Sequence, residues 1–318
     1  MKRNLAKLLP VFVVLVLLVA GWMHRYWLFD SYRLLSFQPS DQITELADRA
    51  GLSEHGRRLF YAARPELLLE ESFDQQCEFA DLGLVLGCYR GADIFILDVT
   101  EAQLEPVEPV TAAHEMLHVV YARLNGDEES ELESLLEAQL EQVTNQRILS
   151  EIKGYRNDPA ADLYNEMHSI FGTELDDLIP ELEAHYAEFF EDRSLVLAES
   201  AAYEKVFNEL EAEIASYDQQ LDELGRRIDN LETSIVALSG QISAERIRLG
   251  QLLQNNQTAQ YNASVSGFNA LVVDHNSKVE LVQALVDEFN SIVAERNANV
   301  AAKNDLIKSL DSNVQTIE

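Results

Sequence analysis

The 318-residue chain has few basic residues, few cysteines and few histidines. It contains 24 lysines and arginines but 55 aspartates and glutamates, so the formal net charge is −31 at pH 7. The phosphates of nucleic acids and anionic lipid headgroups repel such a charge. We therefore expect no nucleic-acid partner, and we interpret most of the acidic residues as solvated faces of helices.

Proline is absent from Glu181 to Glu318, which removes the strongest helix breaker from that stretch. From about residue 195 onward, apolar residues repeat every seven positions in two arms. The first arm repeats at Ile214, Leu221, Ile228, Ile235, Ile242 and Leu249, and the second at Val265, Val272, Val279, Val286, Val293, Val300, Ile307 and Val314. A heptad repeat of this length indicates a coiled coil.

The two arms are out of phase by two residues across a polar stretch, residues 251–262. A continuous coiled coil tolerates discontinuities of three or four residues rather than two. We therefore predict an antiparallel coiled-coil hairpin over residues 195–318, with its turn near 251–262. An unbroken rod that dimerises in parallel is the alternative. Either form could reach a partner protein or associate with a second copy.

Long hydrophobic runs are absent except between residues 8 and 23. Basic residues precede this run and aromatic residues follow it: Lys2, Arg3, Lys7, Trp22, Tyr26 and Trp27. This order is typical of a membrane span with interfacial aromatic residues. We expect residues 1–29 to be an uncleaved anchor, with the N-terminus in the cytoplasm and the rest of the chain outside, in the periplasm or extracellular space. A cleaved signal peptide, and hence a secreted protein, is the alternative.

The only two cysteines are Cys77 and Cys88. They flank a predicted strand at 82–89, which a turn joins to a second predicted strand at 93–99. In an oxidising compartment, two cysteines in this arrangement favour a disulfide that ties the hairpin to the preceding loop. A zinc site built on them is less expected, because they do not form a C-x-x-C pair.

One cluster of histidines stands out, because residues 114–118 read His-Glu-Met-Leu-His within a predicted helix over 109–124. His114 and His118 are one helical turn apart and therefore lie on one face. Zinc hydrolases use such a pair to hold the ion and a carboxylate to take a proton from water. We predict one Zn²⁺ per chain, bound by His114 and His118, with Glu115 as the general base.

A catalytic zinc site needs a third protein ligand. The candidates downstream are Glu166, His168 and Glu174. Glu166 lies in the middle of a predicted helix over 159–171, which we expect to end at Gly172. His168 points about 200° away from Glu166 on that helix, and Glu174 follows its predicted end. Glu166 is therefore the preferred ligand, with Glu174 and His168 as alternatives.

The remaining segments complete the expected organisation. Residues 40–70 have helical periodicity that starts with Asp41 as the predicted N-cap and breaks at Pro65, and further helices are predicted over 127–152 and from Pro180. The predicted fold class is α+β and mostly α. The predicted domains are an anchor at 1–29, a small zincin-like metallopeptidase domain at 30–194 and the coiled coil at 195–318.

The arrangement of a β-hairpin followed by a His-Glu-x-x-His helix resembles the zincin metallopeptidases. In that family the active-site helix follows a small sheet, and peptide substrate lies along the edge strand of the sheet. A ligand glutamate on a second helix is similar to the gluzincin pattern. The resemblance implies His114, His118 and Glu166 as zinc ligands and Glu115 as the general base.

A second short segment also carries a resemblance. Asn165-Glu166, with Ser169 and the Phe-Gly-Thr of 171–173, is similar to the third-ligand segment of the thermolysin family. The chain departs from that family in the longer gap between the two motifs and in Ile170, where the family has an aspartate. The two segments together cover about a tenth of the chain.

These observations predict an extracytoplasmic zinc metallopeptidase that is anchored in the membrane and hydrolyses peptide or protein substrates. The alternative is a non-catalytic envelope scaffold, with a structural or vestigial zinc site and a coiled coil that carries the function. The presence of Glu115 favours the enzyme, because a structural zinc site needs no general base.

Overall fold

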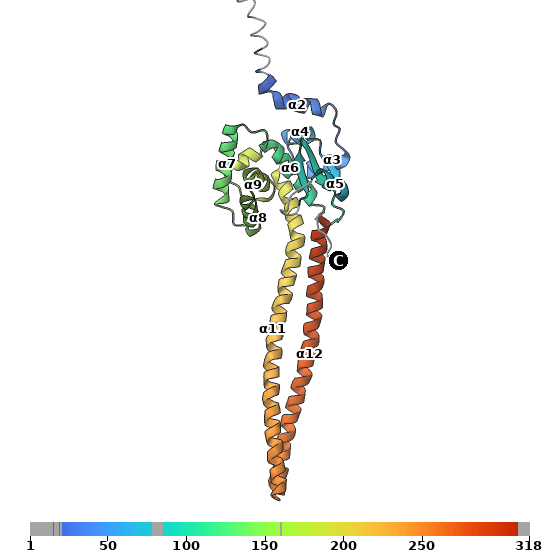
Figure 1. Cartoon of the computed structure of the whole chain (residues 1–318), viewed down its shortest axis with the longest axis vertical. Helices are drawn as coiled ribbons and strands as arrows, with labels where there is room; N and C mark the ends of the chain where they lie inside the picture. Colours follow the sequence, from blue (N-terminus) through green and yellow to red (C-terminus); the bar gives the residue numbers. More distant parts are fainter. Residues whose placement is uncertain (1–14, 16–18, 20, 78–84, 160, 311–318) are drawn as a thin grey trace, which may run out of the picture. The chain divides into compact units, whose positions relative to one another are not determined.

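The computed structural model describes residues 15, 19, 21–77, 85–159 and 161–310 (Figure 1). The chain forms two compact units, one of residues 1–206 with 306–318 and the other of residues 207–305. The described residues are mostly helical and contain a three-stranded sheet. The predicted fold class, α+β and mostly α, is therefore confirmed.

Most of the predicted anchor, residues 1–29, lies outside the described residues, and so does most of its apolar run at residues 8–23. Among the residues that are described, no helix is both long enough and apolar enough to cross a bilayer.

The first unit begins with three helices: α2 (Arg25–Leu34), α3 (Asp41–Arg49) and α4 (Glu54–Ala62). Serines cap the last two, because Ser40 accepts a hydrogen bond from the Ile43 N–H and Ser53 accepts one from the Gly56 N–H. Each serine thereby satisfies a backbone donor of the first helical turn. The cap of α3 is therefore Ser40 rather than the predicted Asp41.

The sheet has the order β1-β3-β2 and contains β1 (Glu66–Leu68), β2 (Gly87–Arg90) and β3 (Asp93–Leu97). The predicted hairpin is present, since β2 pairs with β3 in antiparallel register. Its strands are shorter than predicted, and residues 78–84 lie outside the described residues. Strand β1 pairs in parallel with β3 and was not predicted, because three residues after Pro65 carry no detectable alternation.

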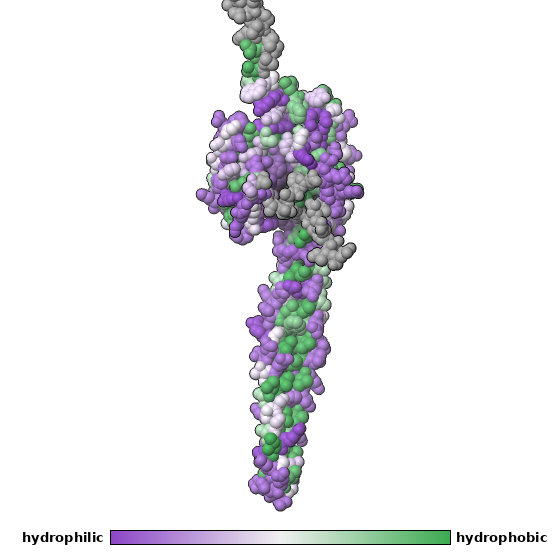
Figure 2. Space-filling model, viewed as in Figure 1, coloured by the Kyte–Doolittle hydropathy of each residue, from purple (hydrophilic) through white to green (hydrophobic). Residues whose placement is uncertain are grey.

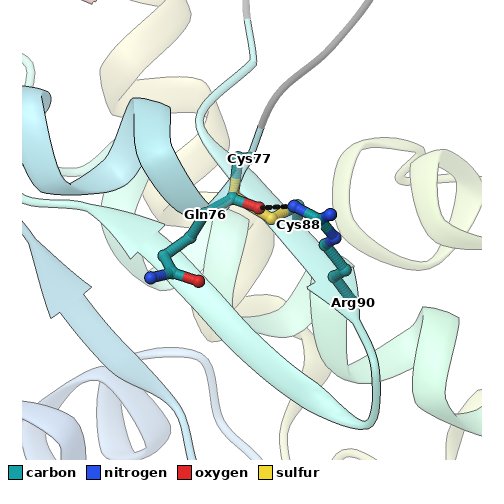
Figure 3. Close-up of a disulfide and its surroundings, with 4 residues drawn as sticks. All are labelled: Gln76, Cys77, Cys88 and Arg90. Carbon is teal, nitrogen blue, oxygen red and sulfur yellow. Dashed lines mark hydrogen bonds between the residues drawn. A yellow bond between two sulfur atoms is a disulfide. The ribbon is translucent and has the colours of Figure 1, made fainter.

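The predicted disulfide is present between Cys77 and Cys88, whose Cα atoms are 6.0 Å apart. It joins the end of α5 (Glu70–Gln76) to β2, and Arg90 supports the connection by donating a hydrogen bond to the Gln76 carbonyl at 2.8 Å (Figure 3). Both cysteines are buried. The edge strand β2 is therefore held by its pairing with β3 and by this covalent link.

Helix α6 (Val107–Tyr121) lies at the centre of the first unit and packs against the sheet and against α3, α4 and α9. Every residue of α6 is buried except His114 and His118. A helix that is apolar on nearly all sides is a core helix. The two histidines therefore mark the only partly open face of α6.

Near the start of α6, the carboxylate of Glu108 is buried and accepts a hydrogen bond from the Val99 N–H at 2.8 Å. Burial raises the pKa of Glu108 to about 7, and the charges of Asp98 and Glu105 act in the same direction. A raised carboxyl pKa means that Glu108 contributes stability below the unfolded-state pKa of about 4.5, and this contribution is lost as the pH rises to 7.

We expect the Glu108→Gln variant to keep the hydrogen bond and lose this pH dependence. The difference in unfolding free energy between pH 4.5 and pH 8 should change by about 3 kcal/mol relative to the parent chain. Urea unfolding at the two pH values measures it. A variant with the same pH dependence as the parent would show that Glu108 ionises normally in the folded protein.

The segment predicted as one helix over 127–152 is two helices, α7 (Gly126–Leu140) and α8 (Gln146–Asn157). The break occurs because Asn145 acts as an N-cap, and its side chain accepts hydrogen bonds from the N–H groups of Arg147 and Ile148. Asparagine stabilises a new helix start in this way. The prediction of a single helix was wrong because this capping signal was overlooked.

Helix α9 (Leu163–Glu174) starts at an Asp162 N-cap, and α10 (Pro180–Tyr186) begins with its proline in the first turn, as predicted. The predicted end of α9 at Gly172 is wrong, because the helix continues through it. A Cβ atom on Gly172 would lie 2.4 Å from a Leu117 methyl and 2.8 Å from the Tyr186 ring. The glycine therefore permits close packing of α9 on α6 rather than ending the helix.

We expect Gly172→Ala to destabilise the first unit by roughly 1–3 kcal/mol, because an added methyl group overpacks the contact between α9 and α6. Gly154→Ala in α8 is the matched control, since nothing lies within 4 Å of its Cβ position. The control should stabilise α8 by up to about 1 kcal/mol through helix propensity. Thermal unfolding measures both, and equal effects of the two substitutions would contradict the packing role.

The second unit is a long helix pair formed by α11 (Arg193–Gln254) and α12 (Thr258–Leu310), of which residues 207–305 belong to this unit (Figure 1). The two helices are antiparallel, because residues later in α11 contact residues earlier in α12. Glu211 pairs with Lys303, Asp218 pairs with Arg296, and Ser239 hydrogen-bonds to His275. The turn lies at residues 255–257, within the predicted range. The antiparallel hairpin is therefore confirmed over the unbroken rod.

The predicted seam of the second arm is correct only in part. Leu285 is 3% exposed, whereas Val279 of the predicted seam is 44% exposed. A pair of helices buries only a narrow stripe of each helix. At this point in α12 the buried position is Leu285, which immediately precedes Val286 of the predicted valine repeat.

Candidate metal centre

Helix α6 places His114 and His118 side by side, as their spacing requires. Their rings lie edge to face with centroids 4.7 Å apart. Their side chains are 19% and 12% exposed, while the neighbouring residues of α6 are buried. Both rings thus reach the same partly open face of the helix.

Helix α9 brings Glu166 to this face. One carboxylate oxygen lies 3.6 Å from His114 Nε2 and the other lies 3.8 Å from His118 Nε2. Nitrogen and oxygen ligands on one tetrahedral zinc ion would be roughly 3.4 Å apart for bonds of about 2.1 Å. The three side chains are therefore spaced as a metal-binding set, within a few tenths of an ångström.

The two imidazoles and the carboxylate are also chemically suited to a divalent transition metal, of which zinc is one. Potential ligand atoms of His114, Glu115 and His118 lie within 4.8 Å of one another. Because Glu166 bridges the two imidazoles from a second helix, we assign the candidate site to His114, His118 and Glu166, with Glu115 beside it.

His118 is held by two side chains of α9. Its Nδ1 atom lies 2.9 Å from Asn165 Oδ1 and 3.2 Å from Ser169 Oγ. An amide oxygen accepts a hydrogen bond, so Nδ1 carries the proton and Nε2 keeps its lone pair for a cation. Orientation of a ligand histidine through its other nitrogen is the usual arrangement in metal sites.

Glu115 contacts strand β2 at Gly87, and one of its carboxylate oxygens lies within 4.8 Å of ligand atoms of His114 and His118. Its side chain is buried, and a Cβ atom on Gly87 would lie 2.8 Å from both its Cγ and Oε1 atoms. A backbone hydrogen bond from Tyr89 reaches this carboxylate. The other oxygen, Oε2, is buried without a hydrogen-bond partner among the described residues. One carboxylate oxygen is thus fixed by the sheet edge, and the other is free to accept a proton.

The charges of the site are strongly coupled. Burial raises the pKa of Glu115 to about 8, with Glu166 adding to the increase. Burial and the charge of His114 lower the pKa of His118 to about 4. For His114, burial lowers the pKa, but the hydrogen bond to Glu166 and the charge of Glu115 outweigh it and raise the value to about 9. The site therefore favours a protonated His114 beside an ionised Glu166.

Burial opposes ionisation of Glu166, but the two histidines and a hydrogen bond with Tyr155 outweigh burial and lower its pKa. Tyr155 comes from α8, and burial together with the charge of Glu166 raises the pKa of this phenol. The hydroxyl of Tyr155 therefore acts as a neutral donor that orients the Glu166 carboxylate.

The structure does not bring the alternative third ligands into this set. Glu174 forms an ion pair with Arg147, which also contacts Glu151 at 3.0 Å. His168 is fully buried, and its Nε2 atom lies 2.9 Å from His185 Nε2. Because α9 continues through Gly172, Glu174 lies more than two turns beyond Glu166 instead of folding back in a turn.

Four contributors to the site were not predicted in these roles: Asn165 and Ser169, which hold His118, Gly87, which admits Glu115, and Tyr155, which orients Glu166. Asn165 and Ser169 flank Glu166 at spacings that place them near its helical face, which is a detectable signal. A glycine inside a strand often marks the close approach of another group. The Tyr186 hydroxyl donates a hydrogen bond to the His168 carbonyl at 2.7 Å.

No protein-family model, curated protein or solved structure matches the chain.

Proposed function

We propose that this chain is a zinc metallopeptidase, anchored in a membrane and facing away from the cytoplasm. The observation that carries the proposal is the convergence of His114, His118 and Glu166 beside the buried carboxylate of Glu115. A purely structural metal site has no need of a buried carboxylate with a free oxygen. This arrangement supports a zincin-like enzyme over a non-catalytic scaffold with a vestigial metal site.

A bound zinc ion would lower the pKa of a water molecule and polarise a peptide carbonyl. Glu115 would accept the proton of the attacking water through Oε2, which has no hydrogen-bond partner in the described part of the chain, and would pass it to the leaving amine. Asn165 and Ser169 hold the His118 ring, and Tyr155 holds Glu166, so that these ligands need not reorganise during turnover.

The position of β2 supports a peptide as the substrate. It is an edge strand of the sheet, and its Gly87 contacts Glu115. Extended peptides bind to sheet edges through backbone hydrogen bonds, largely independent of side-chain identity. A peptide added along β2 would therefore pass directly beside the general base.

The proposed location rests on two observations. The basic and apolar N-terminus has the order of a membrane anchor, and the Cys77–Cys88 disulfide is typical of oxidising compartments outside the cytoplasm.

The proposal is tested by incubating the full-length protein, reconstituted in vesicles, with a library of quenched fluorescent peptides. We expect hydrolysis that a zinc chelator abolishes and that added Zn²⁺ restores. Tight zinc binding without hydrolysis of any peptide in the library would instead support the scaffold.

A further inference from the structure

Helix α2 is attached to the first unit by one face. Asp30 forms two hydrogen bonds with the Arg123 guanidinium, at 2.6 and 2.9 Å, and its side chain is only 5% exposed. Arg33 donates to the Ala62 carbonyl at 2.5 Å and pairs with Asp93. Buried ion pairs that are also hydrogen-bonded hold a fixed geometry. Helix α2 is therefore a rigid part of the unit.

The opposite face of α2 is apolar and exposed. Leu28, Tyr32 and Leu35 follow one another at helical spacings of four and three residues, and they are 50%, 71% and 87% exposed. Trp27 and Phe29 flank this stripe and are 60% and 44% exposed. We call Leu28, Tyr32 and Leu35 the outer stripe of α2.

Exposed apolar side chains are concentrated around this stripe. Among the described residues up to 206, all large exposed hydrophobic residues except Leu69 and Leu195 lie between residues 15 and 35. In Figure 2, hydrophobic residues are visible on the part of the first unit where Figure 1 labels α2. Large contiguous apolar patches mark surfaces that another apolar phase covers.

We propose that α2 lies in the plane of the membrane surface, with its outer stripe inserted among the lipids. The chain itself favours a bilayer as the occupant, because the apolar run of residues 8–23 leads directly into α2. Tryptophan and tyrosine are typical of the interface between lipid and water, and they occur here at residues 22, 26, 27 and 32. Arg25 stacks on the rings of Trp22 and Tyr26, where its charge can reach lipid headgroups.

This placement fixes the orientation of the whole first unit. Arg123, which binds Asp30, lies two residues beyond the C-terminal end of α6, and the Tyr26 hydroxyl contacts the Ala122 carbonyl at 3.5 Å. The end of α6 that follows His118 therefore faces the bilayer. The metal centre is held close to the membrane surface, so membrane-proximal segments of other proteins are within its reach.

The chain contains only two tryptophans, Trp22 and Trp27, which makes a fluorescence test direct. In full-length protein with both replaced by phenylalanine, Tyr32→Trp places a single reporter on the outer stripe. The protein is reconstituted in phosphatidylcholine vesicles that carry bromine near the top of the acyl chains. We expect emission shifted to the blue and strong quenching by the brominated lipid.

Leu69→Trp in the same background is the control, because this position is exposed and follows β1 at the opposite end of the sheet from Asp93, which pairs with Arg33 of α2. It should not be quenched. An unquenched Tyr32→Trp reporter with emission like that of the control would overturn the proposal. Blue-shifted emission without lipid quenching would also overturn it, by showing that a second copy covers α2. Trp27 alone, in Trp22→Phe, provides the same readout without altering the stripe.

Discussion

Replacing Glu115 with glutamine is expected to lower kcat/KM for peptide hydrolysis by about 10²–10⁴-fold, the usual contribution of a positioned general base. Glutamine has the same shape and keeps an oxygen that can accept the hydrogen bond from the Tyr89 backbone. It cannot accept a proton from water. Zinc binding should change little, because the three proposed ligands remain in place.

Glu108→Gln is the matched control for this experiment. Glu108 is also a buried glutamate of α6, but its carboxylate binds the Val99 N–H rather than facing the site. Its substitution should leave kcat/KM within about twofold of the parent, because no group of the reaction is removed. Equal activity of Glu115→Gln and the parent would remove Glu115 from the mechanism.

The second large effect concerns metal affinity. Glu166→Gln removes the carboxylate that bridges His114 and His118, and it should weaken zinc binding by more than about 100-fold, since loss of an orienting partner alone costs 10–100-fold. Competition with a chromophoric chelator measures the affinity.

Glu174→Gln on the same helix is the control, and it should bind zinc like the parent, because Glu174 is paired with Arg147. A loss of affinity in Glu174→Gln with none in Glu166→Gln would mean that Glu174, and not Glu166, is the third ligand. Retained affinity in both variants would place the third ligand elsewhere.

Much of the architecture follows from local patterns in the sequence. The heptad repeats and the phase slip between them predicted a hairpin, and the turn at 255–257 lies where the two registers disagree. The spacing of His114 and His118 required only a helix. The disulfide between Cys77 and Cys88 was predicted from the number of cysteines and from their position beside the predicted hairpin.

The features that were missed depend on contacts between distant segments. Gly172 has the local signature of a helix end, yet it is retained inside α9 because Leu117 and Tyr186 fill the space of a side chain. The short strand β1 exists because β3 offers a partner, not because of its own three residues. Contacts between distant segments leave no periodic pattern in the sequence, so they could not be predicted from it.

The candidate site shows the same division. Histidines and acids near the motif were identifiable from the sequence, but the choice between Glu166 and Glu174 depended on where α9 ends. The alignment of Asn165 and Ser169 with His118 depends on the packing of two helices, across a separation of about 50 residues.

The proposed function requires that His114, His118 and Glu166 hold one metal ion. The most direct test is the zinc content of the full-length protein after equilibration with Zn²⁺ and removal of free metal, compared with His114→Ala and His118→Ala. We predict one zinc ion per chain in the parent and none in either variant. A parent chain without bound zinc, or variants that retain it, would contradict the claim.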